Sequence, residues 1–114
     1  MHSMSKSDFI NDLHGKRVLV TGGRGFIGAT LCRELLKFEA DVWTVARSKP
    51  ERAELQALVA DLQAIDATRQ VISEARPDII IHLASHVVGF RSPDVVLSTY
   101  PSNLTSTVNL LVAA

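Results

Sequence analysis

Three glycines follow an apolar segment near the N-terminus, at a spacing suited to binding a phosphate group. Residues Arg17–Thr21 predict a strand, and Gly22, Gly25 and Gly28 stand three apart before a helical pattern. Glycine lets the backbone turn tightly, and it lets a phosphate approach the main chain without meeting a Cβ atom. The first turn of the helix then offers free N–H groups and the positive end of its dipole. This order of strand, glycines and helix predicts a site for the pyrophosphate of a dinucleotide.

A second group that can bind phosphate is Arg47, which follows the predicted strand Asp41–Ala46. In many dinucleotide sites an acid at the end of the second strand hydrogen-bonds the ribose hydroxyls, and here that position is Ala46. A guanidinium binds a 2′-phosphate well, and Ser48 can add a hydroxyl to the same phosphate. The sequence therefore favours NADP over NAD. The alternative is a solvated surface arginine beside Lys49.

Two histidines, His82 and His86, are four residues apart, which raises the question of a metal site. The segment around them predicts a strand that runs into a loop, so they do not share a helix face. No H-E-x-x-H motif and no pair of cysteines accompanies them. We therefore predict no metal site, with His82 packed at the end of a strand and His86 in a loop.

Strands and helices alternate along the rest of the chain. We expect strands at 17–21, 41–46, 55–60 and 78–84, and helices at 26–38, 65–75 and 92–114, the last bent at Pro101. Such alternation is typical of an α/β fold with a parallel sheet. Right-handed crossovers give the strand order 3-2-1-4, which is the first half of a Rossmann fold.

The predicted helices and strands carry apolar faces for a core. Helical spacing places two sets of residues on one face each: Ile27, Leu31, Leu35 and Phe38 in the first helix, and Ile65, Thr68, Ile72 and Ala75 in the second. The strand at 78–84 is apolar on both faces, as expected inside a sheet covered by helices. We also expect Cys32 and Trp43 to pack in the core.

Composition places the chain among ordinary globular proteins. The 114 residues allow one domain, with 46% apolar and 21% charged residues and a formal net charge of zero. This balance gives no argument for binding nucleic acid or an anionic membrane, and no apolar run approaches the ~20 residues of a membrane span. Residues 1–11 lack the apolar core of a signal peptide, and Cys32 is the only cysteine. We expect a cytoplasmic protein, with a disordered lead-in at 1–14 and a nucleotide-binding domain at 15–114.

Four segments in order resemble the extended short-chain dehydrogenase/reductase superfamily, the group of NAD-dependent epimerases and dehydratases. They are the T-G-x-x-G-x-x-G loop at 21–28, Asp61-Leu62 after the third strand, Ile81-His82-Leu83-Ala84-Ser85, and Asn103 followed by Thr107-Val108-Asn109-Leu110-Leu111. The resemblance runs from about Lys16 to Ala114. It implies the N-terminal part of an NAD(P)-binding Rossmann domain that is incomplete at its C-terminus.

The resemblance also implies roles for single residues. Gly22 forms the turn, Gly25 admits the pyrophosphate, and Gly28 packs the helix on the strand. The other residues implied at the cofactor are Phe26 and Ile27 in the loop, Asp61 and Leu62 at the adenine, Leu83, Ala84 and Ser85 along the cofactor, and Asn103 in the last helix. Asp61 has a second interpretation, as the cap of the helix that follows it.

Members of the superfamily catalyse with a Tyr-x-x-x-Lys pair, which this chain lacks. Its single tyrosine, Tyr100, is followed four residues later by Leu104, and no lysine follows Lys49. We therefore assign no catalytic residue, and we expect a piece of a longer enzyme without turnover of its own. The alternatives are a non-catalytic NAD(P)-binding module and a non-functional remnant. The resemblance also allows a homodimer through the helix at 108–114, and the alternative is that this helix faces the missing half of the domain.

Overall fold

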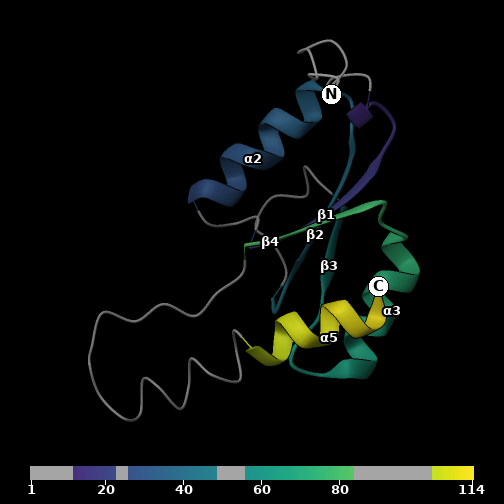
Figure 1. The fold of residues 1–114 in the computed structure, drawn as a ribbon. Coiled ribbons are helices and arrows are strands. Elements are labelled where there is room, and N and C mark those ends of the chain that lie inside the picture. The colour runs from purple at the N-terminus through teal and green to yellow at the C-terminus, as the bar shows by residue number, and fades with distance from the viewer. Residues whose placement is uncertain (1–11, 23–25, 49–55, 84–103) are drawn as a thin grey trace, which may run out of the picture.

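The protein forms a four-stranded parallel sheet (Figure 1). A computed structural model describes residues 12–22, 26–48, 56–83 and 104–114. The strands are β1 (Arg17–Thr21), β2 (Asp41–Ala46), β3 (Gln56–Val59) and β4 (Ile79–His82). Their order in the sheet is β3-β2-β1-β4, and all three pairings are parallel. The predicted α/β class and the strand order 3-2-1-4 are confirmed.

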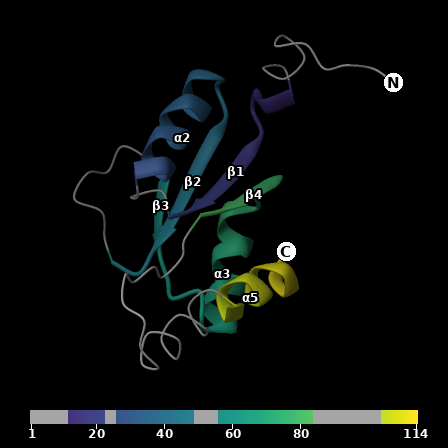
Figure 2. The same ribbon diagram turned by 60° about the vertical axis from the view of Figure 1, so that its left-hand side comes forward.

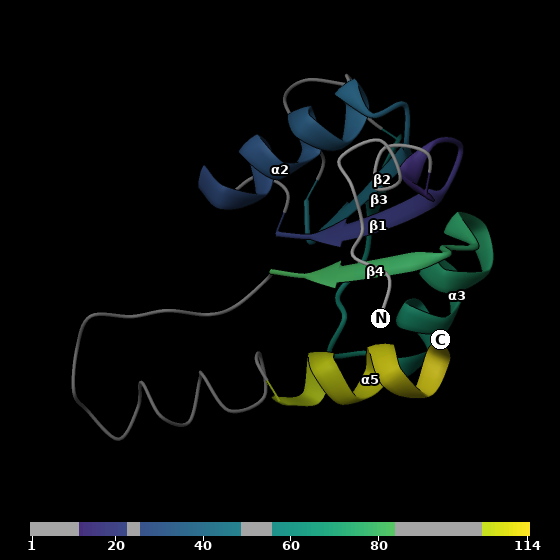
Figure 3. The same cartoon turned by 45° about the horizontal axis from the view of Figure 1, so that its top comes forward.

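Helices cover both faces of this sheet (Figure 3). Helix α2 (Phe26–Lys37) lies on one face, and α3 (Ile65–Ala75) and α5 (Ser106–Ala113) lie on the other. The first two helices are confirmed to within a residue. The expected start of the third at Ser92 and its bend at Pro101 lie outside the described residues. Among the described residues, no helix combines the length and apolar character that crossing a membrane requires.

Strand β1 is the centre of the core because side chains on both of its faces are buried. Val18 and Val20 pack under α2, while Leu19 packs on the opposite face. The cluster under α2 also contains Leu13, Cys32, Leu35, Ala40 and Val42, and the cluster under α3 and α5 contains Val45, Leu62, Val71, Ala75 and Leu110. An apolar run on both faces is the pattern of an inner parallel strand. In contrast, β4 is an edge strand of the described sheet. Ile79 is therefore 37% exposed, although the sequence of β4 is apolar on both faces.

The predicted buried face of α2 is wrong at its first residue, Ile27. Ile27 is 71% exposed, whereas Gly28, Cys32 and Leu35 are buried. The physical reason is that Gly28 has no side chain, so the start of the helix can approach the sheet on that face and Ile27 turns outward. Leu35 is buried as predicted, Leu31 and Phe38 are partly buried and pack against the same cluster, and Cys32 lies in the core as predicted. Trp43 is only half-buried and packs at the border of the second cluster.

The packed part of the chain begins before Gly15. Residues 1–11 of the expected lead-in lie outside the described residues, but Asp12 and Leu13 are helical and Leu13 is buried in the core. The N–H of Lys16 donates to the carbonyl of Leu13 at 3.0 Å, and the N–H of Gly15 donates to the carbonyl of Glu39 at 3.0 Å. The first bond closes the turn before β1, and the second ties this turn to the residues that follow α2.

Candidate functional site

The carboxyl ends of all four strands meet at one edge of the sheet, because the strands are parallel (Figure 2). The chain leaves β1 toward β2 and β3 on one side, and β4 returns on the other side of β1. The strand order therefore reverses between β1 and β4. In open α/β sheets, ligands bind outside the carboxyl ends of the strands at such a reversal.

Gly22 turns the chain at this point. It follows β1 directly and has φ of +76°, a conformation that glycine adopts without steric cost. Helix α2 begins four residues later at Phe26, and its first turn contains no acidic residue. By comparison, the first turn of α3 contains Asp66. The start of α2 therefore offers its free N–H groups without a carboxylate of its own helix to compete for them.

The other residues predicted in the loop fall into three groups. Phe26 and Ile27 are exposed beside the turn, at 91% and 71%. Gly28 is buried, as expected for a glycine that packs the helix on the strand. Gly25 lies outside the described residues.

The ends of β2 and β3 bring Arg47 and Asp61 together. The N–H of Ala60 donates to the carbonyl of Ala46 at 2.9 Å, which continues the pairing of the two strands up to these residues. Arg47 Nε lies 3.9 Å from Asp61 Oδ1, and the two side chains are 64% and 54% exposed. The sequence placed both residues at the cofactor, and the structure puts their side chains side by side at the open edge.

Asp61 does not cap the following helix, so this interpretation was wrong. The N-cap of α3 is Ala64, and it makes no side-chain cap hydrogen bond. A turn at Leu62 and Gln63 separates the carboxylate from the helix. Asp61 Oδ1 instead accepts a hydrogen bond from the N–H of Gln63 at 3.0 Å, which is the local bond of an Asx turn.

Leu62 packs inward beside the exposed Asp61. Its side chain is buried in the cluster under α3 and α5. Its carbonyl accepts hydrogen bonds from Asn109 Nδ2 at 2.8 Å and from Thr68 Oγ1 at 3.1 Å. The structure therefore gives Leu62 a packing role, and the bond from Asn109 links α5 to the segment that carries Asp61.

Two further polar residues at the edge, Thr21 and His82, were not in the predicted site. They are register partners at the ends of β1 and β4, and Thr21 Oγ1 lies 2.6 Å from His82 Nδ1. Thr21 is fully buried, and burial lowers the pKa of His82 below its ordinary value of 6.5. His82 is thus packed at a strand end, as predicted. The predicted strand order 3-2-1-4 placed the two strands side by side, but the register that pairs Thr21 with His82 could not be predicted from it.

Of the remaining residues predicted at the cofactor, the structure describes only Leu83. The N–H of Leu83 donates to the carbonyl of Thr21 at 3.0 Å, and Leu83 is 36% exposed at the open edge. Ala84, Ser85 and Asn103 lie outside the described residues, as does His86. Within the described ranges, no three His, Cys, Asp or Glu side chains gather as metal ligands would.

Comparison with known proteins decides the family. The profile of the NAD dependent epimerase/dehydratase family matches residues 18–114. The chain belongs to this family. Among the relatives of this epimerase/dehydratase-family chain is CDP-glucose 4,6-dehydratase of Salmonella typhimurium, 31% identical over 111 residues. That match covers 89% of this chain and 31% of the relative.

Solved structures agree with the family and the fold. UDP-glucose 4-epimerase of Thermus thermophilus, in complex with NAD, is 30% identical with a TM-score of 0.76, covering 85% of this chain and 33% of that one. A short chain dehydrogenase of Leptospira borgpetersenii with bound NAD+ has a TM-score of 0.81 at 24% identity, covering 99% of this chain and 50% of that one, and it shows the shared fold. The epimerase/dehydratase-family chain thus spans a third to a half of the proteins that it matches.

Proposed function

We propose that the chain binds NAD(P) at the carboxyl edge of the sheet, between β1 and β4. It serves there as the nucleotide-binding portion of an epimerase/dehydratase-type oxidoreductase that acts on a nucleotide sugar or a similar carbonyl or hydroxyl substrate. The observation that carries the proposal is the turn at Gly22, which has φ of +76° and stands between β1 and α2 at the reversal of strand order. When bound, the nicotinamide supplies hydride transfer.

The residues at the edge fit the diphosphate of such a cofactor. Gly22 has no Cβ to block a phosphate, and the first turn of α2 has no acidic side chain to repel one. The buried Gly28 lets α2 begin close to the sheet. The N–H groups at the start of α2 therefore serve as the anion-binding groups, supported by the helix dipole.

Arg47 supports NADP as the preferred cofactor. Its guanidinium is 64% exposed at the end of β2, where the ribose of a dinucleotide bound at the switch point is placed in this type of fold. Its ion pair with Asp61, at 3.9 Å and largely in solvent, is weak enough for a 2′-phosphate to displace. Asp61 lies where it can accept a hydrogen bond from the adenine amino group.

Binding without turnover is the function we propose for the 114 residues by themselves. The chain has one tyrosine, Tyr100, with Leu104 four residues later, and no lysine after Lys49. The proton shuttle of the family is therefore not present in these residues. The same observation supports a second candidate, a non-catalytic NAD(P)-binding module.

Thermal melting with and without dinucleotide tests the proposal. A ligand that binds only the native state at about one hundred times its Kd adds about 2.7 kcal/mol of stability. We expect NAD and NADP to raise the melting temperature at millimolar concentration, and adenosine, which has no phosphate, to leave it unchanged. An unchanged melting temperature with both dinucleotides would contradict the proposal. Steady-state turnover of a nucleotide sugar by the 114 residues would contradict the binding-only assignment.

We also propose that the outer side of α5 forms a contact with a second copy of the chain. Val108, Leu111 and Val112 expose 46%, 74% and 59% of their surface there. Sedimentation equilibrium tests this contact. The expected result is a dimer that Leu111→Lys converts to a monomer, and a monomeric wild type at high micromolar concentration would contradict it.

A further inference from the structure

The end of β1 is held from one side by two consecutive residues, His82 at the end of β4 and Leu83 after it. The N–H of Leu83 donates to the carbonyl of Thr21 at 3.0 Å, and His82 Nδ1 lies 2.6 Å from Thr21 Oγ1. One contact fixes the main chain of Thr21 and the other fixes its side chain. The next residue is Gly22, where φ becomes +76° and the chain turns out of the sheet. The turn therefore starts from a residue that is held at both its backbone and its side chain.

The side-chain contact is short and partly buried. Thr21 is fully buried, and His82 is about half-buried beside it as its register partner. A hydrogen bond of this kind contributes about 0.5–1.5 kcal/mol to the stability of the arrangement that it joins. Burial also lowers the pKa of His82, which keeps the ring neutral near pH 7. A neutral ring lets Nδ1 accept the proton of the Thr21 hydroxyl.

We propose that His82 is a positioning residue for the dinucleotide site: its Nδ1 holds the Thr21 hydroxyl and thereby fixes the strand end from which Gly22 turns. The inference rests on the proposed function, since it assigns His82 to the same site. It gives His82 no contact with the cofactor. Its effect passes through Thr21 to the backbone of Gly22, which is the proposed phosphate site.

Two pairs of substitutions separate this role from general packing. His82→Asn keeps a polar group near the position of Nδ1, whereas His82→Leu removes it. Thr21→Ser keeps the hydroxyl, whereas Thr21→Val removes it and preserves the shape of the side chain. We expect His82→Leu and Thr21→Val each to weaken NAD(P) binding about five- to tenfold, the size of one lost hydrogen bond, and the two conservative variants to stay within about twofold.

The double variant gives the sharper test. If both side chains act through the one contact, His82→Leu combined with Thr21→Val weakens binding no more than either change alone. Calorimetry well below the melting temperature measures the affinity of folded protein only. If His82→Leu does not fold, Thr21→Val carries the same test. Additive losses, or equal losses for His82→Leu and His82→Asn, would overturn the proposal.

A second readout needs no ligand. The amide resonance of Gly22 and its hydrogen exchange report the turn directly in the free protein. We expect the resonance to shift and exchange to become faster in His82→Leu and Thr21→Val, and to stay unchanged in His82→Asn and Thr21→Ser. If the wild type binds neither dinucleotide, the proposed function fails, while the Gly22 amide still decides the positioning role. An unchanged amide in all four variants would overturn it.

Discussion

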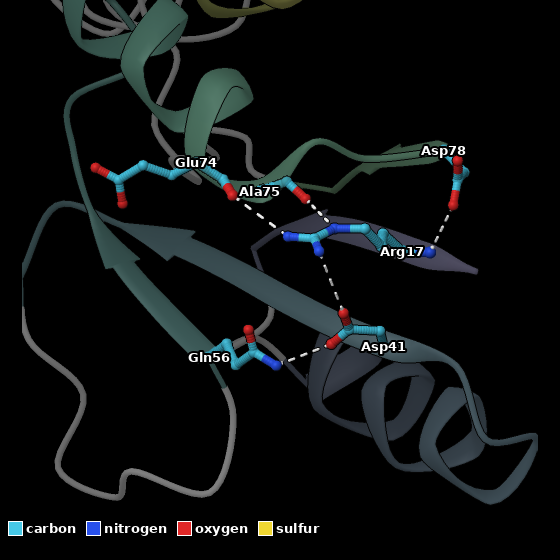
Figure 4. A network of polar contacts seen from close by, with 6 residues as sticks. All are labelled: Arg17, Asp41, Gln56, Glu74, Ala75 and Asp78. Atoms are coloured by element: carbon cyan, nitrogen blue, oxygen red, sulfur yellow. Dashed lines mark hydrogen bonds and ion pairs between the residues drawn. The ribbon is translucent and has the colours of Figure 1, made fainter. Parts of the chain in front are cut away.

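An arginine lies at each end of the parallel strands, Arg17 at their amino ends and Arg47 at their carboxyl ends, and the two have different partners. At the amino edge, Arg17 Nε donates to the carbonyl of Ala75 at 2.6 Å, and Nη2 donates to the carbonyl of Glu74 at 3.3 Å (Figure 4). Its Nη1 lies 3.9 Å from Asp41 Oδ2. The backbone N–H of Arg17 donates to Asp78 Oδ2 at 2.8 Å. One residue thus connects β1, β2, the end of α3 and the start of β4.

Arg47, at the carboxyl edge, has an exposed guanidinium instead. Among the residues that the structure describes, its ion-pair partner is Asp61, at 3.9 Å and itself exposed. The guanidinium of Arg17 donates to protein carbonyls and connects elements of the fold, whereas that of Arg47 is largely exposed to solvent. Burial and partners, more than residue type, therefore distinguish the structural Arg17 from Arg47, for which we propose a binding role.

The largest effect that we expect is the loss of stability in Arg17→Met, which removes the contacts of Arg17 at the amino ends of the strands. The change leaves the carbonyls of Glu74 and Ala75 at the end of α3 without their donors, and it removes the cation that lies 5.1 Å from the centre of the Trp43 ring. We expect the free energy of unfolding to fall by about 2–3 kcal/mol, measured by urea denaturation, since hydrogen bonds to charged groups contribute about 1.5–3 kcal/mol.

Arg33→Met is the matched control, because Arg33 lies on the exposed side of α2. Surface changes of this kind stay within about 0.5 kcal/mol. The affinity of folded Arg17→Met protein for NAD(P) is expected to equal that of the wild type. Equal destabilisation by the two changes would show that the contacts of Arg17 add nothing to the fold.

The second effect compares two glycines at opposite ends of β1. Gly15 and Gly22 have φ of +72° and +76°, so alanine at either position takes a left-handed conformation that costs about 1–2 kcal/mol. A Cβ atom added at Gly15 meets nothing within 4 Å. We therefore expect similar losses of stability from Gly15→Ala and Gly22→Ala.

Only Gly22→Ala is expected to weaken dinucleotide binding, by about 10- to 100-fold, which corresponds to about 1.4–2.8 kcal/mol. Calorimetric titration of both folded variants with NAD and NADP measures this difference. If Gly15→Ala weakened binding as much as Gly22→Ala, the result would contradict a pyrophosphate site at the carboxyl ends of the strands.

The third prediction concerns Arg47 and the preference for NADP over NAD. Arg47→Asp replaces a cation with an anion at the end of β2, beside Asp61. We expect NADP affinity to fall about tenfold or more, because the 2′-phosphate loses a charged partner and meets a repelling one. NAD affinity is expected to change less than about threefold, within the range of a surface charge change. An equal loss for the two dinucleotides would show that Arg47 does not contact the 2′-phosphate.

A smaller effect follows from the titration of His82. Burial lowers the pKa of its ring in the folded protein below the value of 6.5 expected in the unfolded chain. The unfolded state therefore takes up the proton first as the pH falls. The stability that the neutral, buried His82 ring contributes is fully present above pH 6.5 and is lost as the pH falls through the lowered pKa. We expect the free energy of unfolding, measured by urea denaturation at a series of pH values, to fall less between about pH 7.5 and about pH 5 in His82→Asn than in the wild type.

Sequence patterns predicted most of the fold because they depend on local geometry. The bounds of β1, β2 and α3 follow from apolar periodicity and from breakers such as Pro77, and the structure places them at the predicted residues. The exposed Ile27 did not follow, because the apolar spacing of α2 fits two neighbouring stripes. Which stripe is buried depends on how closely Gly28 lets the helix approach the sheet, which is a tertiary property.

The candidate site was predictable where it depends on backbone shape. The turn at Gly22 was predictable because only glycine adopts that conformation freely. The pairing of Arg47 with Asp61 and of Thr21 with His82 joins residues that are far apart in the sequence. These contacts depend on strand register, and a pattern along one segment contains no information on register. Asp61 was misinterpreted as a cap for a related reason, since the length of the turn before α3 decides its partner.

The smallest effect sharpens the comparison between the two arginines. Asp41 holds Arg17 at 3.9 Å and is held in turn by Gln56 Nε2 at 2.8 Å, whereas Asp61 at the same distance from Arg47 is more than half exposed. Asp61→Asn removes a negative charge that competes with a 2′-phosphate for Arg47. We expect NADP to bind about two- to threefold more tightly relative to NAD, since an exposed ion pair contributes less than about 1 kcal/mol. The preference is measured by paired titrations at low and high salt, and the gain should shrink at high salt. An unchanged preference, with equal changes in affinity for NAD and NADP, would mean that Asp61 acts on the adenine that both cofactors share and leaves Arg47 unaffected.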